Sequence, residues 1–330
     1  MERKKTRLVC SLSILGMFLL LLPSVGSGQV NCGYGGTGTG IQAAITAAAS
    51  GDTISVTGIC AENIDIPKSV TIDGGGTAEI HAPVSTQSAV RIRAGVVTLK
   101  NFHSIQGGQD GVYVVSSTWS TILNNTIQST HRDGVFVDFG GAPTINGNTI
   151  KNTARYGIIV FANAYAAIIN NTITNNPGDG ILVTEGAVAR IGFLSSSQTT
   201  ASPNTITGNE GDGINVTRAS QAWIVGNTIS NNDGNGVTVT KVSHAGVSNN
   251  TINQNGVNGI EVSQGSGANL GSDTGTTIFE LPNTTTINNG GRGLECSVGG
   301  YVDGRLGTLN GVLGRKSITR GCVNSLTPLY

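Results

Sequence analysis

The sequence is poor in charged residues. Asp, Glu, Lys and Arg make up only 12% of its 330 residues, and 19 basic side chains balance 19 acidic ones. A chain with zero formal net charge lacks the basic excess that binds nucleic acids or anionic membranes, so neither is an expected partner. The chain is rich in Asn and Thr and has 49 glycines. Apolar residues recur regularly between them, which favours a β-solenoid over a low-complexity chain.

Closely spaced cysteines are also missing. The sequence has no C-x-x-C pair of the kind that structural zinc sites use, so we expect no metal site built from thiolates. Of the five cysteines, Cys10 lies in an apolar N-terminal stretch. In an exported chain the other four predict two disulfides. They fall into two distant groups, and we expect each group to be bridged: Cys32 with Cys60, and Cys296 with Cys322.

Residues 1–28 have the pattern of a secretory signal peptide. Basic residues precede an apolar stretch at 8–22, and small residues follow at the predicted cleavage zone. The apolar stretch has roughly 15 residues, fewer than the ~20 that cross a bilayer, so we expect it to be cleaved. No lipobox precedes Cys32. The mature protein is therefore predicted to be secreted, periplasmic or at the cell surface, with no integral membrane segment.

Two sequence markers repeat in phase along most of the chain. Glycines that open an apolar run are mostly 23 residues apart, and so are Asn-Thr-Ile triplets. Such a period indicates stacked structural units. Each unit holds short, alternating, β-branched segments separated by Gly or Asn, which predicts three strands per coil. The glycines are Gly111, Gly134, Gly157, Gly180, Gly213, Gly236, Gly259 and Gly293, and the triplets begin at Asn125, Asn148, Asn171, Asn204, Asn227 and Asn250.

The N-T-I and D-G-I-x-V pattern resembles the right-handed parallel β-helix superfamily, also called pectin-lyase-like, including its NosD-type repeat proteins. The resemblance covers roughly residues 40–298 and implies an all-β solenoid of about ten coils. We expect a leader and an amphipathic capping helix at 29–52, the β-helix at 53–298, and a C-terminal cap or tail at 299–330. We also expect the Asn columns to form amide ladders that satisfy backbone groups at the turns.

Alternation along the strand after each glycine predicts which side chains face outward. In four successive coils the outward positions are apolar, whereas later coils carry Thr, Asn and Glu there. An apolar patch on the outside of a solenoid indicates a surface for a protein partner, unless a terminal segment of the same chain covers it. The patch comprises Tyr113, Phe136, Ile159, Phe161 and Leu182.

A second outward face is predicted around the A-W-I segment of the repeat. Both tryptophans of the chain lie there, and flat aromatic rings suit the faces of sugars. Together with Tyr113 and Asp138 on the strands that follow the glycines, this face supplies our predicted substrate-binding residues. Two longer repeats insert loops at 193–203 and 272–284, which would either wall a groove or only decorate it. The predicted substrate-binding residues of the second face are Trp119, Tyr165, Arg190 and Trp223.

The coil at 129–139 and its neighbours hold the densest group of titratable side chains. Asp110 and Asp133, on adjacent coils, are candidates for the carboxylate pair of a hydrolase. A lyase or epimerase acting on a uronic acid needs a base, for which His131 or Tyr156 is a candidate. It also needs a cation for the substrate carboxylate, a role open to Arg132 or Arg155.

The resemblance leaves activity open. D-G-V at Asp110 and Asp133 occupies the phase of N-T-D-G-I in polygalacturonases, but the paired D-D, the G-H-G and a downstream R-I-K are missing. The D-P-H-D of alginate epimerases is missing too. No cofactor is expected, although calcium on Asp110, Asp133 and Asp138 is an alternative. The sequence thus predicts a protein that binds a polysaccharide or glycoconjugate. One interpretation is that it also processes this ligand, as a lyase, hydrolase or epimerase. The alternative is a non-catalytic structural or adhesin-like surface protein, or a partner-binding scaffold.

Overall fold

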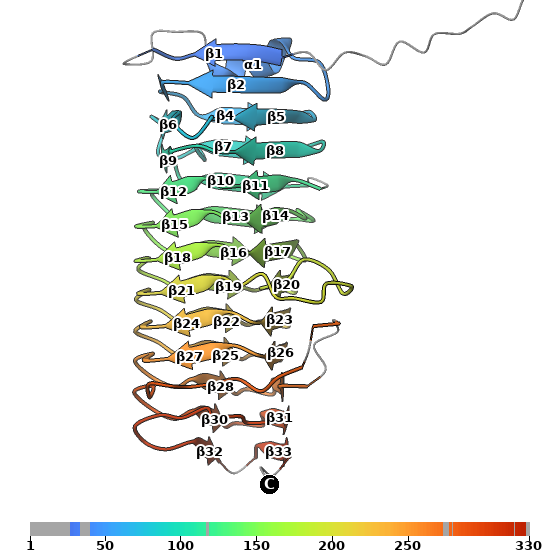
Figure 1. Cartoon of the computed structure of the whole chain (residues 1–330), viewed down its shortest axis with the longest axis vertical. Helices are drawn as coiled ribbons and strands as arrows, with labels where there is room; N and C mark the ends of the chain where they lie inside the picture. Colours follow the sequence, from blue (N-terminus) through green and yellow to red (C-terminus); the bar gives the residue numbers. More distant parts are fainter. Residues whose placement is uncertain are drawn as a thin grey trace, which may run out of the picture.

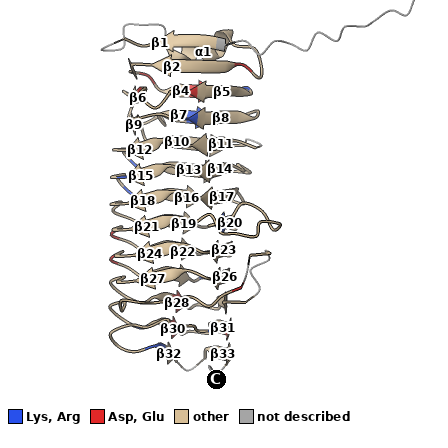
Figure 2. Cartoon of the chain, viewed as in Figure 1, with Lys and Arg blue, Asp and Glu red and all other residues tan. Residues whose placement is uncertain are grey.

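The computed structural model describes residues 27–33, 40–116, 119–272, 277–278, 280–319 and 321–327. Apart from Ser27 and Gly28, the predicted signal peptide lies outside these residues. The described chain winds into a parallel β-solenoid whose coils stack along one axis (Figure 1). Figure 2 shows few charged residues along its strands. No helix of the described part is long and apolar enough to cross a membrane.

Three parallel sheets form the sides of the solenoid, as the repeat predicts. The 13-stranded sheet contains β1 (Ser27–Asn31), β2 (Thr53–Thr57), β5 (Val70–Asp73), β8 (Val97–Lys100), β11 (Thr121–Leu123), β14 (Thr144–Asn146), β17 (Tyr165–Ile169), β20 (Val188–Ile191), β23 (Gln221–Val225), β26 (His244–Ser248), β29 (Gly267–Leu270), β31 (Tyr301–Gly304) and β33 (Val323–Leu326). The 11-stranded sheet contains β4 (Ile64–Ile66), β7 (Val90–Ile92), β10 (Val112–Val115), β13 (Val135–Asp138), β16 (Ile158–Val160), β19 (Ile181–Val183), β22 (Ile214–Val216), β25 (Val237–Val239), β28 (Ile260–Val262), β30 (Leu294–Cys296) and β32 (Lys316–Ile318). The 9-stranded sheet contains β3 (Ile59–Cys60), β6 (Glu79–Ala82), β9 (Ser104–Gly107), β12 (Thr126–Gln128), β15 (Thr149–Lys151), β18 (Thr172–Thr174), β21 (Thr205–Thr207), β24 (Thr228–Ser230) and β27 (Thr251–Asn253).

The solenoid is longer than the sequence indicated, with about twelve turns instead of about ten. Strand β1 begins before residue 53 and pairs in parallel with β2. At the other end β31, β32 and β33 continue two sheets past residue 298, where we had placed the end of the β-helix. These coils lack the 23-residue markers, and their strands are recognisable only from their pairing.

The pairing of strands places equivalent inward-facing residues of successive coils on top of one another. Ile122, Ile145, Ile168, Ile191 and Ile224 pair in that order and are all fully buried. Since β-branched side chains pack well on a pleated surface, the columns fill the interior without helices. A one-residue slip would turn a whole column outward, so burial fixes the register.

Each coil bends at three corners, and in the regular coils each corner uses the left-handed backbone region. Asn124, Asn170 and Asn249 lie at one corner, with φ of 55°, 57° and 56°. Gly147 takes the same place with φ of 67°. Asn and Gly adopt such angles more readily than other residues, which explains their abundance in the sequence.

Buried asparagine ladders close two of the corners, as predicted. At Asn204 the side-chain oxygen accepts the Asn171 backbone N–H at 2.9 Å. Its amide donates to the Ile168 carbonyl at 2.8 Å and to the Asn227 side-chain oxygen at 2.9 Å. The same pattern repeats through Asn125, Asn148, Asn171, Asn204, Asn227, Asn250 and Asn283, and a second ladder runs through Asn176, Asn209, Asn232, Asn255 and Asn289.

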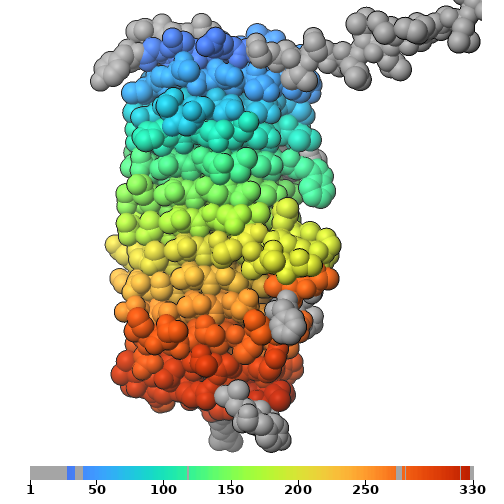
Figure 3. Space-filling model, viewed as in Figure 1, coloured from blue at the N-terminus to red at the C-terminus, as the bar shows by residue number. Residues whose placement is uncertain are grey.

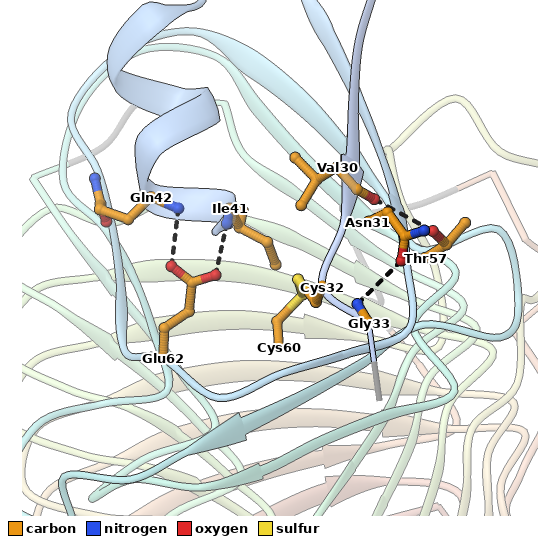
Figure 4. Close-up of a disulfide and its surroundings, with 9 residues drawn as sticks. All are labelled: Val30, Asn31, Cys32, Gly33, Ile41, Gln42, Thr57, Cys60 and Glu62. Atoms are coloured by element: carbon orange, nitrogen blue, oxygen red, sulfur yellow. Dashed lines mark hydrogen bonds between the residues drawn. A yellow bond between two sulfur atoms is a disulfide. The ribbon is translucent and has the colours of Figure 1, made fainter. Parts of the chain in front are cut away.

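The N-terminal end is capped as expected. Helix α1 (Ile41–Ala47) buries Ile41 and Ile45 against the first coils. Its N-cap residue is Gly40, which has no side chain to cap the helix, so Glu62 supplies the acceptor (Figure 4). The Glu62 carboxylate accepts the Ile41 and Gln42 N–H groups at 2.5 and 3.0 Å. A negative charge at this position also complements the helix dipole.

Both predicted disulfides are present. Cys32–Cys60 ties β1 to the strand that opens the 9-stranded sheet, beside the Glu62 cap (Figure 4). Cys296–Cys322 ties β30 to the final coil. Each bridge therefore fastens a terminal coil, where a solenoid has only one neighbouring coil to stabilise it.

Replacing Asn204 with Ala should lower the free energy of unfolding by about 1–3 kcal/mol, because a buried N–H and a buried carbonyl lose their partners. Chemical denaturation of Asn204→Ala and wild type measures this. Thr205→Ala is the control, since Thr205 is exposed on the neighbouring position, and should change stability by less than about 0.5 kcal/mol. Equal stability of Asn204→Ala and wild type would contradict a structural role for the ladder.

Removing the bridge in the double variant Cys32→Ala, Cys60→Ala should destabilise the N-terminal coils by about 3 kcal/mol, because the closed loop spans 28 residues. Hydrogen exchange of the β1 and β2 amides measures the loss locally. Removing Cys296–Cys322, which spans 26 residues, should leave exchange at β1 unchanged and accelerate it at β33. Faster exchange at both ends in either variant would argue against local fastening.

Candidate functional site

A row of aromatic and aliphatic side chains runs across the outer face of the 11-stranded sheet. Tyr113, Phe136, Ile159 and Leu182 occupy one outward register position on β10, β13, β16 and β19. The Tyr113 and Phe136 rings stack with centroids 5.1 Å apart, and Phe136 meets Phe161 edge-on at 5.9 Å. Such contacts stabilise aromatic pairs beyond the apolar area that they bury.

The predicted apolar patch is less exposed than we expected. Ile159 and Leu182 face outward but are only 5% and 8% exposed. Tyr113, Phe136 and Phe161 remain half-buried. The described terminal segments extend the sheets at the two ends of the solenoid and do not cover this face (Figure 1).

Arginines lie over the rings of this face. The guanidinium of Arg91 is 5.8 Å from the Tyr113 centroid, and that of Arg132 is 4.7 Å from Phe136. At 3.0 Å the Tyr113 hydroxyl donates to Asp138. Burial, and then this bond to a carboxylate, raise the pKa of Tyr113 to about 12. Tyr113 therefore keeps its proton at physiological pH.

Two hollows, each of about 300 Å³, open on the same face. The first is lined by Asn63, Asp65, Gln87, Arg91, Gln109 and Tyr113, among others. The second lies several coils further on, with Tyr156, Ile159, Phe161, Asp179, Leu182 and Asn215 in its wall and Arg155, Arg218 and Lys241 beside them. Each combines apolar surface with a few polar and cationic groups, as ligand sites do.

The predicted catalytic group does come together, but its carboxylates are tied up. Asp110 is 1% exposed and receives two hydrogen bonds from Arg132, at 2.9 and 2.8 Å. Asp133 is fully buried and receives two from Arg155, at 2.9 and 2.5 Å. Both arginines therefore neutralise carboxylates of the protein. This geometry favours a structural role for the four residues over acid–base chemistry.

His131 and Tyr156, the two candidate bases, also contact other groups of the protein. The His131 ring Nδ1 lies 3.0 Å from the Gly108 carbonyl oxygen. The backbone N–H of Tyr156 donates to Asp133 at 3.2 Å, and its ring lies 4.7 Å from the Arg155 guanidinium. Burial, followed by the negative charge of Asp179, raises the pKa of the Tyr156 hydroxyl, so it is a poor base at neutral pH.

Aspartates and asparagines at the position before most of the repeat glycines form a third set of rungs. Asp212 N–H donates to Asp179 at 2.8 Å, and Asn235 N–H donates to Asp212 at 2.7 Å. The ladder continues through Asn235 and Asn258 to Arg292, and its first members are Asp110 and Asp133. The sequence analysis did not single out Asp179, which also lines the second hollow. The available signal in the sequence was Gly211, which occupies the position that Arg132 and Arg155 hold on the coils after Asp110 and Asp133.

Calcium has no open carboxylate group among the three residues suggested for it. Asp110 and Asp133 accept from arginines, and Asp138 accepts from Tyr113 and from the Phe139 N–H at 2.8 Å. Among the described residues, the one cluster with metal-ligand geometry is Cys32, Cys60 and Glu62. Its sulfurs are bridged and its carboxylate caps α1, so it does not fit a metal either.

The second predicted face is partly closed. Trp119 is 75% exposed, but Trp223 packs against a small cluster of Phe193, Val225 and Ile278. Arg190 lies between the Tyr165 and Phe193 rings, 5.9 and 5.7 Å from their centroids. The tryptophans, Tyr165 and Arg190 thus do not form one open platform.

The two inserted loops account for this closure. Thr277 donates its backbone N–H to the Ser196 carbonyl at 3.0 Å and its hydroxyl to the Gln198 carbonyl at 2.9 Å. Figure 3 shows the two insertions beside each other on one side of the solenoid, in yellow and orange. Their described parts pack on one another over Trp223, instead of walling a groove.

Comparison with known proteins agrees with this architecture. The sequence matches the family described as "Right handed beta helix region" over residues 50–191, 110–274 and 191–305. A "Cell surface glycoprotein" of Methanothermus fervidus is 43% identical over 68 residues, or 21% of this chain. The chain therefore matches only 11% of the length of that relative.

Solved structures share the fold. Pectate lyase Pel9A has a TM-score of 0.55 and 13% identity, over 92% of this chain and 78% of its own. An alginate lyase from Paenibacillus sp. str. FPU-7 has a TM-score of 0.45 and 12% identity, over 90% and 99% of the two chains. At such identities the first likeness is evidence of fold alone, and the second adds none. The family match covers most of the solenoid, and the chain accordingly belongs to the right-handed β-helix family.

Proposed function

We propose that this protein is exported and binds a polysaccharide along the outer face of the 11-stranded sheet. The observation that carries the proposal is the contact between the rings of Tyr113, Phe136 and Phe161, with a hollow at either end. Strands ~4.8 Å apart give an extended, regular surface that suits a chain of repeating sugars. Apolar rings would contact sugar C–H faces, and the polar side chains of the hollows would bond to hydroxyls.

The cations of this face favour an acidic polysaccharide, such as one that contains uronic acids. Arg91 is exposed, and no carboxylate lies within ion-pair distance of it among the described residues. Lys241 is likewise exposed at the rim of the second hollow. Guanidinium and ammonium groups in these places would bind sugar carboxylates through charge-assisted hydrogen bonds.

Binding, rather than turnover, is the activity that these residues support. Asp110 and Asp133 are buried under arginines, so they are neither accessible nor free to exchange protons with a substrate. The two disulfides fit an oxidising compartment outside the cytosol. The named cell-surface relative fits an extracellular place as well, although it shares only a short segment.

Isothermal titration of the purified protein with polygalacturonate, alginate and a neutral glucan tests the proposal. We expect the acidic polymers to bind. Arg91→Ala and Phe161→Ala, one at each hollow, should each weaken binding by about tenfold. Thr205→Ala, on the 9-stranded sheet, is the matched control and should leave the affinity unchanged.

The same samples should be followed for unsaturated product and for new reducing ends. Binding without product agrees with the proposal, whereas turnover would replace it with an enzymatic function. If none of the three polymers binds, glycan binding is wrong and the face is better explained as a site for a protein partner.

A further inference from the structure

The Asp/Asn ladder on the edge of the 11-stranded sheet does not require negative charge. At each rung a side-chain oxygen accepts the backbone N–H of the next coil. Asn235 accepts the Asn258 N–H at 2.9 Å, and Asn258 accepts the Arg292 N–H at 2.8 Å. Neutral amides thus perform the same structural task as the aspartates, so carboxylates at other rungs need another explanation.

The aspartates of the ladder fall into two classes. Asp110 and Asp133 are neutralised by arginines of the following coil, Arg132 and Arg155. The equivalent position that would serve Asp179 is Gly211. A Cβ on Gly211 would lie 2.5 Å from the Asp179 Oδ1 atom and 2.7 Å from its backbone nitrogen. Packing therefore leaves no room for a compensating side chain at that place.

Asp212 repeats the arrangement on the next coil. The residue that would serve it is Gly234, whose Cβ would lie 2.4 Å from the Asp212 Oδ1 atom. No Lys, Arg or His of the described residues lies within ion-pair distance of either carboxylate. Asp179 instead accepts the Asp212 N–H and, at 3.1 Å, the Asn215 amide. Two uncompensated carboxyl groups consequently lie on adjacent coils.

Asp179 also lines the second hollow, where its charge meets any ligand. Arg155 and Tyr156 approach from the turn before β16, and Asp212 and Asn215 from β22 and the turn before it. Arg218 and Lys241 approach from the turns that follow β22 and β25. The cations differ in availability: Arg155 binds Asp133, Arg218 binds Glu185 at 2.5 Å, and Lys241 has no carboxylate partner among the described residues.

We propose that Asp179 determines the charge of the sugar that the second hollow accepts. With Asp179 protonated, the hollow is a polar, net cationic site that binds the carboxylate of an acidic sugar. With Asp179 ionised, its negative charge offsets the charge of Lys241, so the hollow attracts that carboxylate less strongly. This inference rests on the glycan-binding function proposed above and specifies how its binding face responds to acidity.

The protonation change falls in a useful pH range. Burial, and then repulsion by Asp212, raise the pKa of Asp179 to about 6, and burial raises the pKa of Asp212 as well. No histidine of the described part of the chain lines the hollow. Uronic acid carboxylates are ionised throughout, so Asp179 is the group whose charge changes.

Binding of polygalacturonate at pH 5 and pH 7.5, by wild type and by Asp179→Asn, tests the inference. Asn preserves the ladder bond, as Asn235 and Asn258 do. Wild-type affinity should fall by about tenfold between the two pH values, since one charge is added beside the ligand. Asp179→Asn should bind equally well at both. An unchanged pH dependence in Asp179→Asn would overturn the inference.

Asp212→Asn is the matched comparison. It removes the neighbouring charge but keeps Asp179, so the pH dependence should persist with its midpoint moved to lower pH. Binding that is equally tight at both pH values in wild type contradicts the inference and leaves glycan binding intact. Absence of binding to any polymer contradicts both proposals.

Thermal unfolding provides a readout that needs no ligand. A carboxyl group whose pKa is raised by folding stabilises the fold when protonated, and this contribution is lost as the pH rises through about 6. Wild type should therefore lose Tm relative to Asp179→Asn between pH 5 and pH 7.5. If the difference in Tm between the two proteins stays constant over this range, Asp179 does not change its protonation there and the inference fails.

Discussion

The structure depends on one interaction, in which a side-chain oxygen at a corner of one coil accepts a backbone N–H of an adjacent coil. Strand hydrogen bonds satisfy the sides of the solenoid, but the corners leave polar backbone groups buried without partners. Three ladders of Asn and Asp fill this need, and each rung fixes the spacing between two coils. Asn at the corners is therefore as much a structural requirement of the repeat as Ile in the core.

Much of this could be predicted from the sequence, because stacking makes every column of the repeat a structural position. The spacing of glycines and Asn-Thr-Ile triplets gives the coil, the inward columns and two ladders. The terminal coils could not be predicted, since β1 and β31 to β33 lack the markers and join the sheets through backbone pairing alone. Outward direction was predicted correctly for Ile159 and Leu182, but their exposure depends on neighbouring side chains that periodicity does not describe.

The candidate site illustrates the same limit. The sequence drew attention to Asp110, Asp133, Arg132 and Arg155 because titratable groups are densest there, and the structure brings them together as ion pairs. The high density of charged side chains therefore reflected aspartates and arginines that neutralise one another. Asp179 has little but glycine around it in sequence, and burial and the charge of Asp212 raise the pKa of its carboxyl group to about 6. In a repeat protein, a ladder position whose surroundings differ from those of its neighbours says more about a functional site than the segment with the most charged residues.

The contact between the two inserted loops has a consequence for how the solenoid comes apart. In a linear array each coil interacts with its neighbours alone, so fraying that starts at one end can stop at any coil. The bonds from Thr277 to Ser196 and Gln198 connect segments 79–81 residues apart, on coils that do not touch through their sheets. Opening the C-terminal coils past this point requires releasing a coil well inside the array. The loops thus join several coils into one cooperative unit in the part of the solenoid that contains the second hollow.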